Sequence, residues 1–145
     1  MILVALFGLA LLGLTTLIHY EVLRALSVGL PALRIPARIK LVVVIFAAFL
    51  AHLVEIALYA ATIKFMVGNL GLGTLGNATD LNFSIALYFS TETYSSLGYG
   101  DLVPGGDLRL LAGCEALNGL LLVGWSASYI YIAMERFWNE PAAGE

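Results

Sequence analysis

Three long apolar segments constrain this chain more than any other feature. They run from residue 1 to about 26, from Leu41 to Met66, and over residues 108–135. A helix needs about 20 mainly apolar residues to cross the hydrocarbon core of a bilayer. Composition agrees, because 61% of the residues are hydrophobic and only 12% are charged, too few for the surface of a soluble domain. We therefore predict an all-α integral membrane protein with three transmembrane helices.

The first segment has two interpretations, a retained helix and a cleaved signal peptide. A basic region is missing after Met1 and no small-residue cleavage site precedes the polar stretch, which favours a retained helix. The stretch Ile18–Arg24 suits the interfacial end of that helix, so His19 is expected near the membrane surface as a structural or snorkelling residue. The segment has no series of spaced arginines, which argues against voltage sensing.

The positive charges indicate how the chain crosses the membrane. Residues 27–40 combine turn formers with basic side chains, at Gly29, Pro31, Pro36, Arg34, Arg38 and Lys40. Short basic loops stay on the cytoplasmic side, so we expect the N-terminus outside and the C-terminus in the cytoplasm, in the plasma membrane. The seven basic residues form no run, so the expected partners are membrane lipids and not nucleic acid.

A shorter segment between the second and third apolar stretches is predicted to enter the membrane without crossing it. Residues 82–95 are amphipathic and too short to span a bilayer, and they follow a glycine-rich loop over residues 68–80. Residues 96–101 then contain two glycines and no helical pattern. Non-helical backbone at membrane depth is tolerated where protein buries it or water lines it, so this pattern predicts a re-entrant helix beside a cavity.

The stretch from Ala86 to Pro104, centred on Ser96-Leu97-Gly98-Tyr99-Gly100-Asp101, resembles the pore region of the potassium channel family. The resemblance extends more loosely over residues 41–137 and implies that family's pore fold. It implies an outer helix over 41–66, a pore helix over about 82–95, a selectivity-filter loop over 96–101 and an inner helix over 108–135. Residues 1–40 are then an additional N-terminal helix with its basic loop, and residues 138–145 a short cytoplasmic tail.

The resemblance also implies passive, potassium-selective conduction by a homotetramer, with bound K⁺ and no other cofactor. By resemblance, K⁺ is held by the carbonyls of Ser96, Leu97, Gly98 and Tyr99 and by the Ser96 hydroxyl. Gly98 and Gly100 can take left-handed dihedral angles at little cost, which lets successive carbonyls face one axis. Ser96 replaces the usual threonine and keeps its hydroxyl, whereas Leu97 replaces a β-branched residue and is less stiff.

Several supporting residues follow from the resemblance. Glu92 and Asp101 match two acids that share a proton behind the filter, and Tyr88 and Phe89 match an aromatic cuff. Gly119 lies near the flexible glycine of the inner helix, although close helix packing explains it equally well. An apolar gate is expected at the inner end of the last helix, from Tyr129, Ile130, Ile132, Ala133 and Phe137.

Two acids lie within the predicted spanning helices, where an isolated charge is costly. Glu55 with His52, and Glu115 with Asn118, lie at comparable depths, so we predict that they form one buried polar cluster. The alternative is that each acid binds independently to backbone or to pore-helix hydroxyls such as Ser90 and Ser95.

Two other functions are compatible with these residues. A pore subunit that regulates another channel without conducting would be recognised by hetero-assembly. A membrane enzyme using His52, Glu55 and Glu115 is disfavoured, because acids within membranes more often pair structurally or serve ion paths. Catalytic and nucleotide-binding motifs are not evident, and Cys114 lies in an apolar run where a thiol usually packs as a small hydrophobe.

Overall fold

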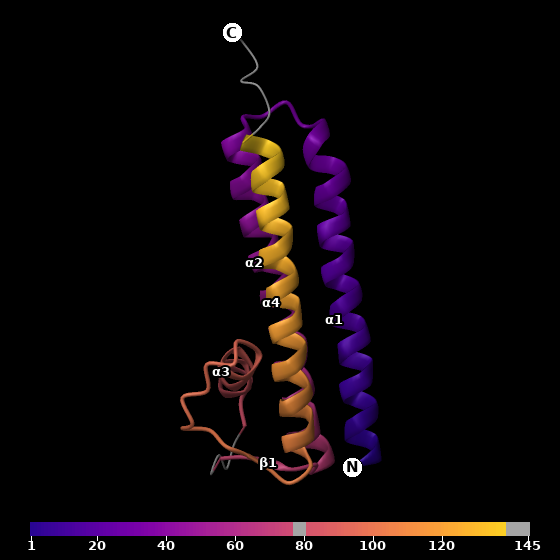
Figure 1. The fold of residues 1–145 in the computed structure, drawn as a ribbon. Coiled ribbons are helices and arrows are strands. Elements are labelled where there is room, and N and C mark those ends of the chain that lie inside the picture. The colour runs from indigo at the N-terminus through magenta and orange to yellow at the C-terminus, as the bar shows by residue number, and fades with distance from the viewer. Residues whose placement is uncertain (77–80, 139–145) are drawn as a thin grey trace.

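Three long helices run side by side and form the body of the protein. The computed structural model describes residues 1–76 and 81–138, and its long helices are α1 (Ile2–Gly29), α2 (Ala37–Leu70) and α4 (Leu108–Trp138). Each packs against the other two, and all three are long and apolar enough to cross a membrane (Figure 1). This arrangement confirms the predicted all-α membrane fold with three transmembrane helices.

The connection between α1 and α2 is shorter than predicted. The first helix continues to Gly29, a 3-10 turn covers Leu30–Ala32, and α2 already begins at Ala37. Pro36 precedes α2 with φ −52°, an angle that its ring already favours, so the basic residues after it enter the first helical turns. At its other end α2 continues to Leu70 and stops at Gly71, whose φ of 61° is the left-handed angle of a helix C-terminus.

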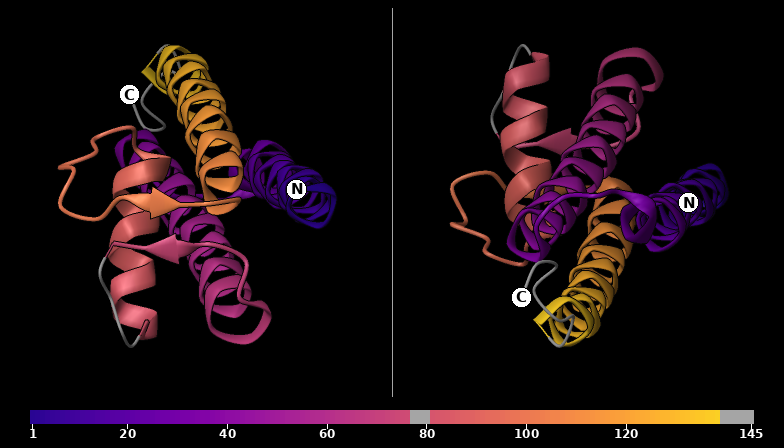
Figure 2. Two further views of the ribbon diagram at one scale, coloured as in Figure 1. Left: turned by 90° about the horizontal axis from the view of Figure 1, so that it is seen from below. Right: turned by 90° about the horizontal axis from the view of Figure 1, so that it is seen from above.

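The predicted pore helix is α3 (Phe83–Tyr94), which lies at the end of the bundle that holds the N-terminus (Figure 1). Its N-terminus is capped by Asn82, whose Oδ1 accepts a hydrogen bond of 2.9 Å from the backbone N–H of Ile85. The helix packs against α2 and α4, and α1 lies on the far side of those two helices (Figure 2). The observed bounds agree with the predicted span of 82–95.

A two-stranded pairing that the sequence did not predict joins the segments on either side of α3. Strand β1 (Thr74–Leu75) runs antiparallel to β2 (Pro104–Gly105), with Thr74 opposite Gly105 and Leu75 opposite Pro104. A Cβ at Gly105 would lie 2.3 Å from Oγ1 of Thr74, so a larger residue there would force the Thr74 side chain to rotate away. We call this pairing the β-clasp.

The first helix buries one narrow stripe of side chains, at Val4, Gly8, Leu11, Thr15, His19 and Leu23. Their spacing of three or four residues keeps them on one helix face. The snorkelling interpretation of His19 is wrong, because its side chain is fully buried in the bundle as a structural residue, whereas its neighbour Tyr20 is 48% exposed. Successive helical residues point about 100° apart, so adjacent polar residues have different environments.

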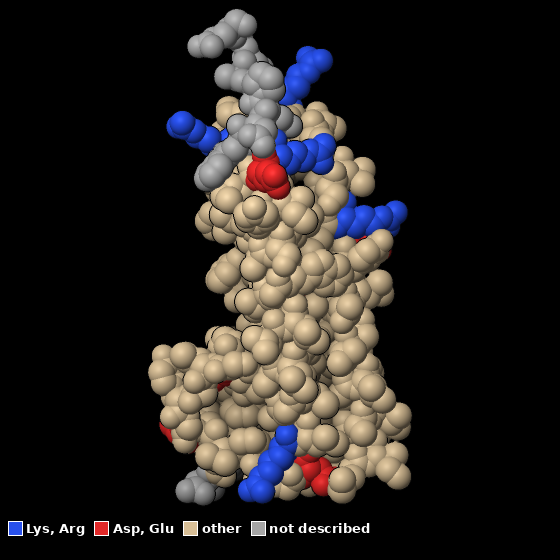
Figure 3. All heavy atoms as spheres, viewed as in Figure 1, with Lys and Arg blue, Asp and Glu red and all other residues tan. Residues whose placement is uncertain are grey.

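Basic side chains gather at one end of the bundle. Arg24 lies near the C-terminal end of α1, and Arg34 lies in the connection between α1 and α2. Arg38 and Lys40 are at the start of α2, and Arg136 is in the last turn of α4. Figure 3 shows the basic side chains gathered at this end. The middle of the visible surface carries almost no charge (Figure 3). The predicted tail over 138–145 lies outside the described residues except for the backbone of residue 138.

Candidate functional site

The loop that follows α3 is folded back on the end of that helix. The N–H groups of Leu97 and Gly98 both donate to the carbonyl of Glu92, at 2.9 and 3.3 Å. Gly98 and Gly100 have φ of 53° and 81°, which glycine adopts at little cost. Ser96 also has a positive φ, of 57°, where a β-branched residue would be strongly disfavoured. Serine at this position therefore fits the backbone better than threonine.

Residues 96–101, which we call the filter loop, extend away from the bundle (Figure 1). Leu97 and Tyr99 are 60% and 70% exposed within a single chain. A Cβ at Gly98 or Gly100 would meet no atom of the described chain within 4 Å. One chain therefore does not enclose the positions at which the predicted ion-binding carbonyls lie.

The acids beside the filter loop lie close to Tyr88. The hydroxyl of Tyr88 donates to Oδ2 of Asp101 at 3.1 Å, and Oε1 of the buried Glu92 has no hydrogen-bond partner among the described residues. No direct contact joins Glu92 to Asp101 among the described residues, and Tyr88 lies close to both acids, so the shared proton stays a prediction.

The two aromatic residues of the predicted cuff have different environments. Phe89 is 4% exposed and belongs to the main hydrophobic core, whereas Tyr88 is 41% exposed. Phe89 therefore anchors α3 against the bundle, and Tyr88 holds the end of the filter loop through Asp101.

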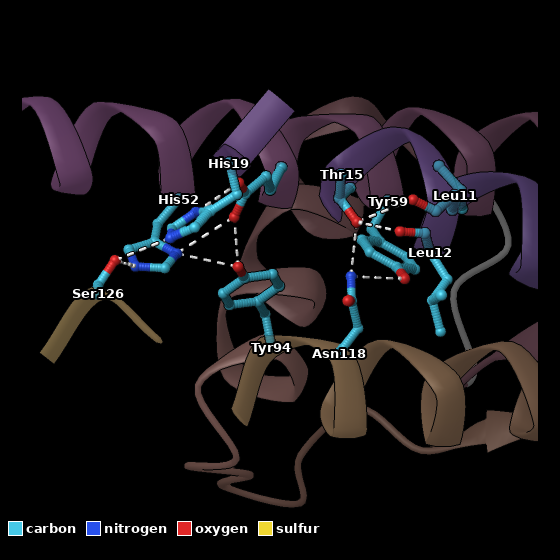
Figure 4. Close-up of polar contacts among 10 residues, drawn as sticks. Leu11, Leu12, Thr15, His19, His52, Tyr59, Tyr94, Asn118 and Ser126 are labelled. Carbon is cyan, nitrogen blue, oxygen red and sulfur yellow. Dashed lines mark hydrogen bonds and ion pairs between the residues drawn. The ribbon is translucent and has the colours of Figure 1, made fainter. Parts of the chain in front are cut away.

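A buried polar cluster lies directly behind the end of α3. Glu55 of α2 is fully buried, and its Oε1 is 3.0 Å from Nδ1 of His19 on α1. Its Oε2 accepts a short hydrogen bond from the Tyr94 hydroxyl and lies 3.2 Å from Nδ1 of His52 (Figure 4). Glu55 thus joins the first helix to the last residue of α3, two positions before the filter loop.

Ser126 of α4 closes this cluster into a ring. Its Oγ lies 3.0 Å from Nε2 of His19 and 3.0 Å from Nε2 of His52 (Figure 4). Both imidazoles therefore place Nδ1 toward Glu55 and Nε2 toward Ser126. We call His19, His52, Glu55, Tyr94 and Ser126 the histidine ring.

The predicted single cluster of Glu55, His52, Glu115 and Asn118 is wrong in part. Glu55 and His52 do meet, but the Asn118 amide donates to Thr15 at 2.7 Å and to Tyr59 at 3.2 Å (Figure 4). Glu115 is fully buried, and neither of its carboxyl oxygens has a hydrogen-bond partner in the described part of the chain. The Ser90 hydroxyl lies close enough to Glu115 to interact with it, although the two groups do not meet the geometry of a hydrogen bond, so the alternative bonding to Ser90 stays a prediction.

Gly119 allows α4 to approach the end of α3 very closely. A Cβ at this position would lie 2.0 Å from the carbonyl oxygen of Tyr94. This contact supports the packing interpretation of Gly119, and α4 continues as one helix through this position. Its use as a hinge stays a prediction.

Four of the residues expected at the inner gate line one pocket between the ends of α1 and α4, at Tyr129, Ile132, Ala133 and Phe137. Ala133 and Phe137 are buried with Leu30 and Val44 in a second core, and Tyr129 and Ile130 pack partly against it. Ile132 is 61% exposed. Ala133 and Phe137 thus pack within one chain in this conformation, and the gate stays a prediction.

Sequence reasoning missed Tyr94 and Ser126 and did not predict the burial of His19. The signal available for His19 was its spacing of four from Thr15 and from Leu23 on the buried face of α1. Ser126 lies eight residues after Asn118, close to the same face of α4, but a single serine in an apolar helix has no distinctive pattern.

Comparisons with known proteins cover most of the pore region. The sequence pattern of a family described as "Ion channel" matches residues 39–136. The inward rectifier potassium channel Kirbac3.1 of Paramagnetospirillum magnetotacticum is 41% identical over 69 residues, which are 47% of this chain and 22% of that protein. The chain thus covers about a fifth of the length of this relative. No solved structure matches the chain.

Proposed function

The chain belongs to the ion channel family, whose pattern covers residues 39–136, and on that premise we propose that it conducts potassium selectively and passively as a homotetramer. The match to an inward rectifier potassium channel confirms the predicted kinship with potassium channels. Ion channels are integral membrane proteins and form a class separate from enzymes. The three apolar helices α1, α2 and α4 agree with a membrane location.

The backbone of the filter loop is the observation that carries potassium selectivity. Gly98 and Gly100, on either side of Tyr99, have left-handed backbone angles, and the Glu92 carbonyl fixes the start of the loop by accepting from two N–H groups. A K⁺ ion entering a ring of such carbonyls exchanges its water for protein oxygens. The sites are proposed at Ser96, Leu97, Gly98 and Tyr99.

The exposure of the filter loop supports assembly. A single chain supplies one strand of carbonyls, and its apolar Leu97 and large Tyr99 side chains are more than half exposed. Four copies around one axis would complete the carbonyl rings and cover these side chains. The exposed apolar residues on α1 and α2 are then available to lipid or to neighbouring copies.

The distribution of basic residues supports the orientation. The end of the bundle with Arg34, Arg38 and Arg136 is proposed to face the cytoplasm, by the preference of positive loops for that side. The filter loop, which lies toward the opposite end, would then open to the outside of the plasma membrane (Figure 1).

Cation flux into liposomes that contain only this protein tests the proposal. We expect K⁺ and Rb⁺ to enter far faster than Na⁺, and cross-linking in the same liposomes to give a tetramer. Equal K⁺ and Na⁺ entry would refute selectivity. A tetramer that passes neither ion would favour the alternative, a regulatory subunit that needs another channel as its partner.

A further inference from the structure

The histidine ring contains groups that channel conduction does not require. His19, His52 and Glu55 each offer one metal-ligating atom, and the three atoms lie within 4.8 Å of one another. Two imidazoles and one carboxylate are the protein ligands of a common type of zinc site. We propose that these three residues form a site for a divalent transition-metal ion of the zinc class.

The hydrogen bonding of the ring favours a cation at this position. Four contacts join His19 to Glu55, Tyr94 to Glu55, and Ser126 to each of the two histidines. The fifth joins Nδ1 of His52 to either Glu55 or Tyr94, since this nitrogen can form only one of the two hydrogen bonds. Each of these five contacts needs one hydrogen. Two neutral imidazoles, one serine and one tyrosine bring one hydrogen each, and an ionised carboxylate brings none. One contact is therefore left without a hydrogen, so the cluster accommodates one further positive charge, which either a proton on one imidazole or a bound metal ion supplies.

The groups around the three ligands already suit a bound metal. Both histidines place Nδ1 toward Glu55, which leaves both Nε2 atoms 3.0 Å from the Ser126 hydroxyl. Metal-bound histidines usually donate their other N–H to a nearby oxygen, and the serine oxygen has two lone pairs to accept both. Tyr94 donates to the second carboxylate oxygen and so orients Glu55.

The burial of the site favours binding and still leaves a way in. The side chains of His19 and Glu55 are fully buried, and the side chain of His52 remains 16% exposed. A buried carboxylate gains more from a neighbouring cation than an exposed one does. The edge of His52 is the side from which an ion reaches the ligands.

The three ligands come from two helices, so metal binding would draw α1 and α2 together. Ligand atoms of a tetrahedral zinc site lie roughly 3.4 Å apart, closer than the widest separation in the ring. Because Tyr94 is bonded to Glu55, the end of α3 would follow this movement.

Binding of Zn²⁺ and Co²⁺ to the metal-stripped full chain in detergent tests the site. We expect saturable binding of about one Zn²⁺ per chain and the visible absorption of tetrahedral Co²⁺, displaced by Zn²⁺. His19→Gln and His52→Gln should abolish the absorption, and His52→Cys should retain it with a thiolate-shifted spectrum. Ser126→Ala should weaken binding about 10- to 100-fold, as losses of hydrogen-bonded supports usually do.

Glu115→Gln is the matched control, since it removes another buried acid of the bundle and should leave metal binding unchanged. Metal binding by the unmutated chain can be measured even if a variant fails to fold. Absence of saturable Zn²⁺ binding by that chain would overturn the proposal. Unchanged Co²⁺ absorption in His19→Gln or His52→Gln would also overturn it, because the metal would then lie elsewhere.

Discussion

The histidine ring reaches the filter loop through Tyr94, two residues before the loop, yet the two regions differ in almost every physical respect. In the ring, largely buried side chains from four helices contact one another within a single chain. In the filter loop, Leu97 and Tyr99 are mostly exposed, and hydrogen bonds hold the loop at its ends, through Glu92 and Asp101. The comparison teaches that one chain completes the support of the filter but not the filter itself.

The largest effect is expected from breaking the filter loop. Gly98→Ala should abolish K⁺ flux, because a side chain at φ 53° is strained and would face the proposed ion path. Gly113→Ala in α4 is the control, since a Cβ there also meets nothing within 4 Å but the backbone is helical. Flux from a tetrameric Gly98→Ala protein at the unmutated rate would contradict the assignment of the loop.

Removing the central acid of the histidine ring should give the next largest effect. Glu55→Ala leaves the donors of His19 and Tyr94 without their buried partner and should lower the free energy of unfolding by about 3 kcal/mol. Thermal unfolding in detergent measures the change.

Glu115→Ala provides the comparison for Glu55→Ala, because its carboxyl has no hydrogen-bond partner among the described residues. It should cost clearly less than Glu55→Ala, since no buried donor loses its partner. Equal losses for the two variants would mean that the contacts of Glu55 contribute nothing beyond packing.

Gly119→Ala tests how closely α4 must pack against the end of α3, which carries Tyr94 of the histidine ring. The added Cβ overlaps the Tyr94 carbonyl, and overpacking of this kind costs about 1 to 3 kcal/mol. Gly124→Ala, at an open position of the same helix, should change the unfolding temperature little. If both variants unfold at the same temperature, α4 does not approach α3 as closely as described.

The smallest expected effect concerns the start of the filter loop. Ser96→Thr places a β-branched residue at φ 57° and should lower tetramer stability by about 1 kcal/mol. Ser95→Thr is the matched control, because Ser95 has a right-handed helical φ of −78°. Heating followed by electrophoresis of the tetramer compares the two. Greater loss in Ser95→Thr would reverse the explanation given for serine at position 96.

The long elements were predictable because each depends on a local pattern. Continuous apolar runs indicated α1, α2 and α4, and the short amphipathic stretch before Gly98 indicated α3. The exact ends were less accurate, since Pro36 and Gly71 act through backbone angles and not through hydropathy. The division into an N-terminal segment, a pore domain and a tail stays a prediction.

The candidate site divides in the same way. The filter loop was found from its glycines and its resemblance to a family, which are properties of a few adjacent residues. The histidine ring depends on contacts between residues as distant in sequence as His19 and Ser126, and no local pattern specifies them. The pairing of Tyr88 with Asp101 depends likewise on the path of the loop, so the sequence indicated the acids but not their partners.

The β-clasp has a thermodynamic consequence for the segment that it encloses. Leu75 and Pro104 are paired, so α3 and the filter loop occupy a closed loop of the 28 residues from 76 to 103. The entropy cost of closing a loop rises only slowly with length, by about 0.6 kcal/mol for each doubling. Extra residues before α3 should therefore be tolerated, whereas an insertion between Pro104 and Leu108 would pull the clasp out of register. The clasp thus separates the segment before α3, which should tolerate insertions, from the segment between the clasp and α4, which should not.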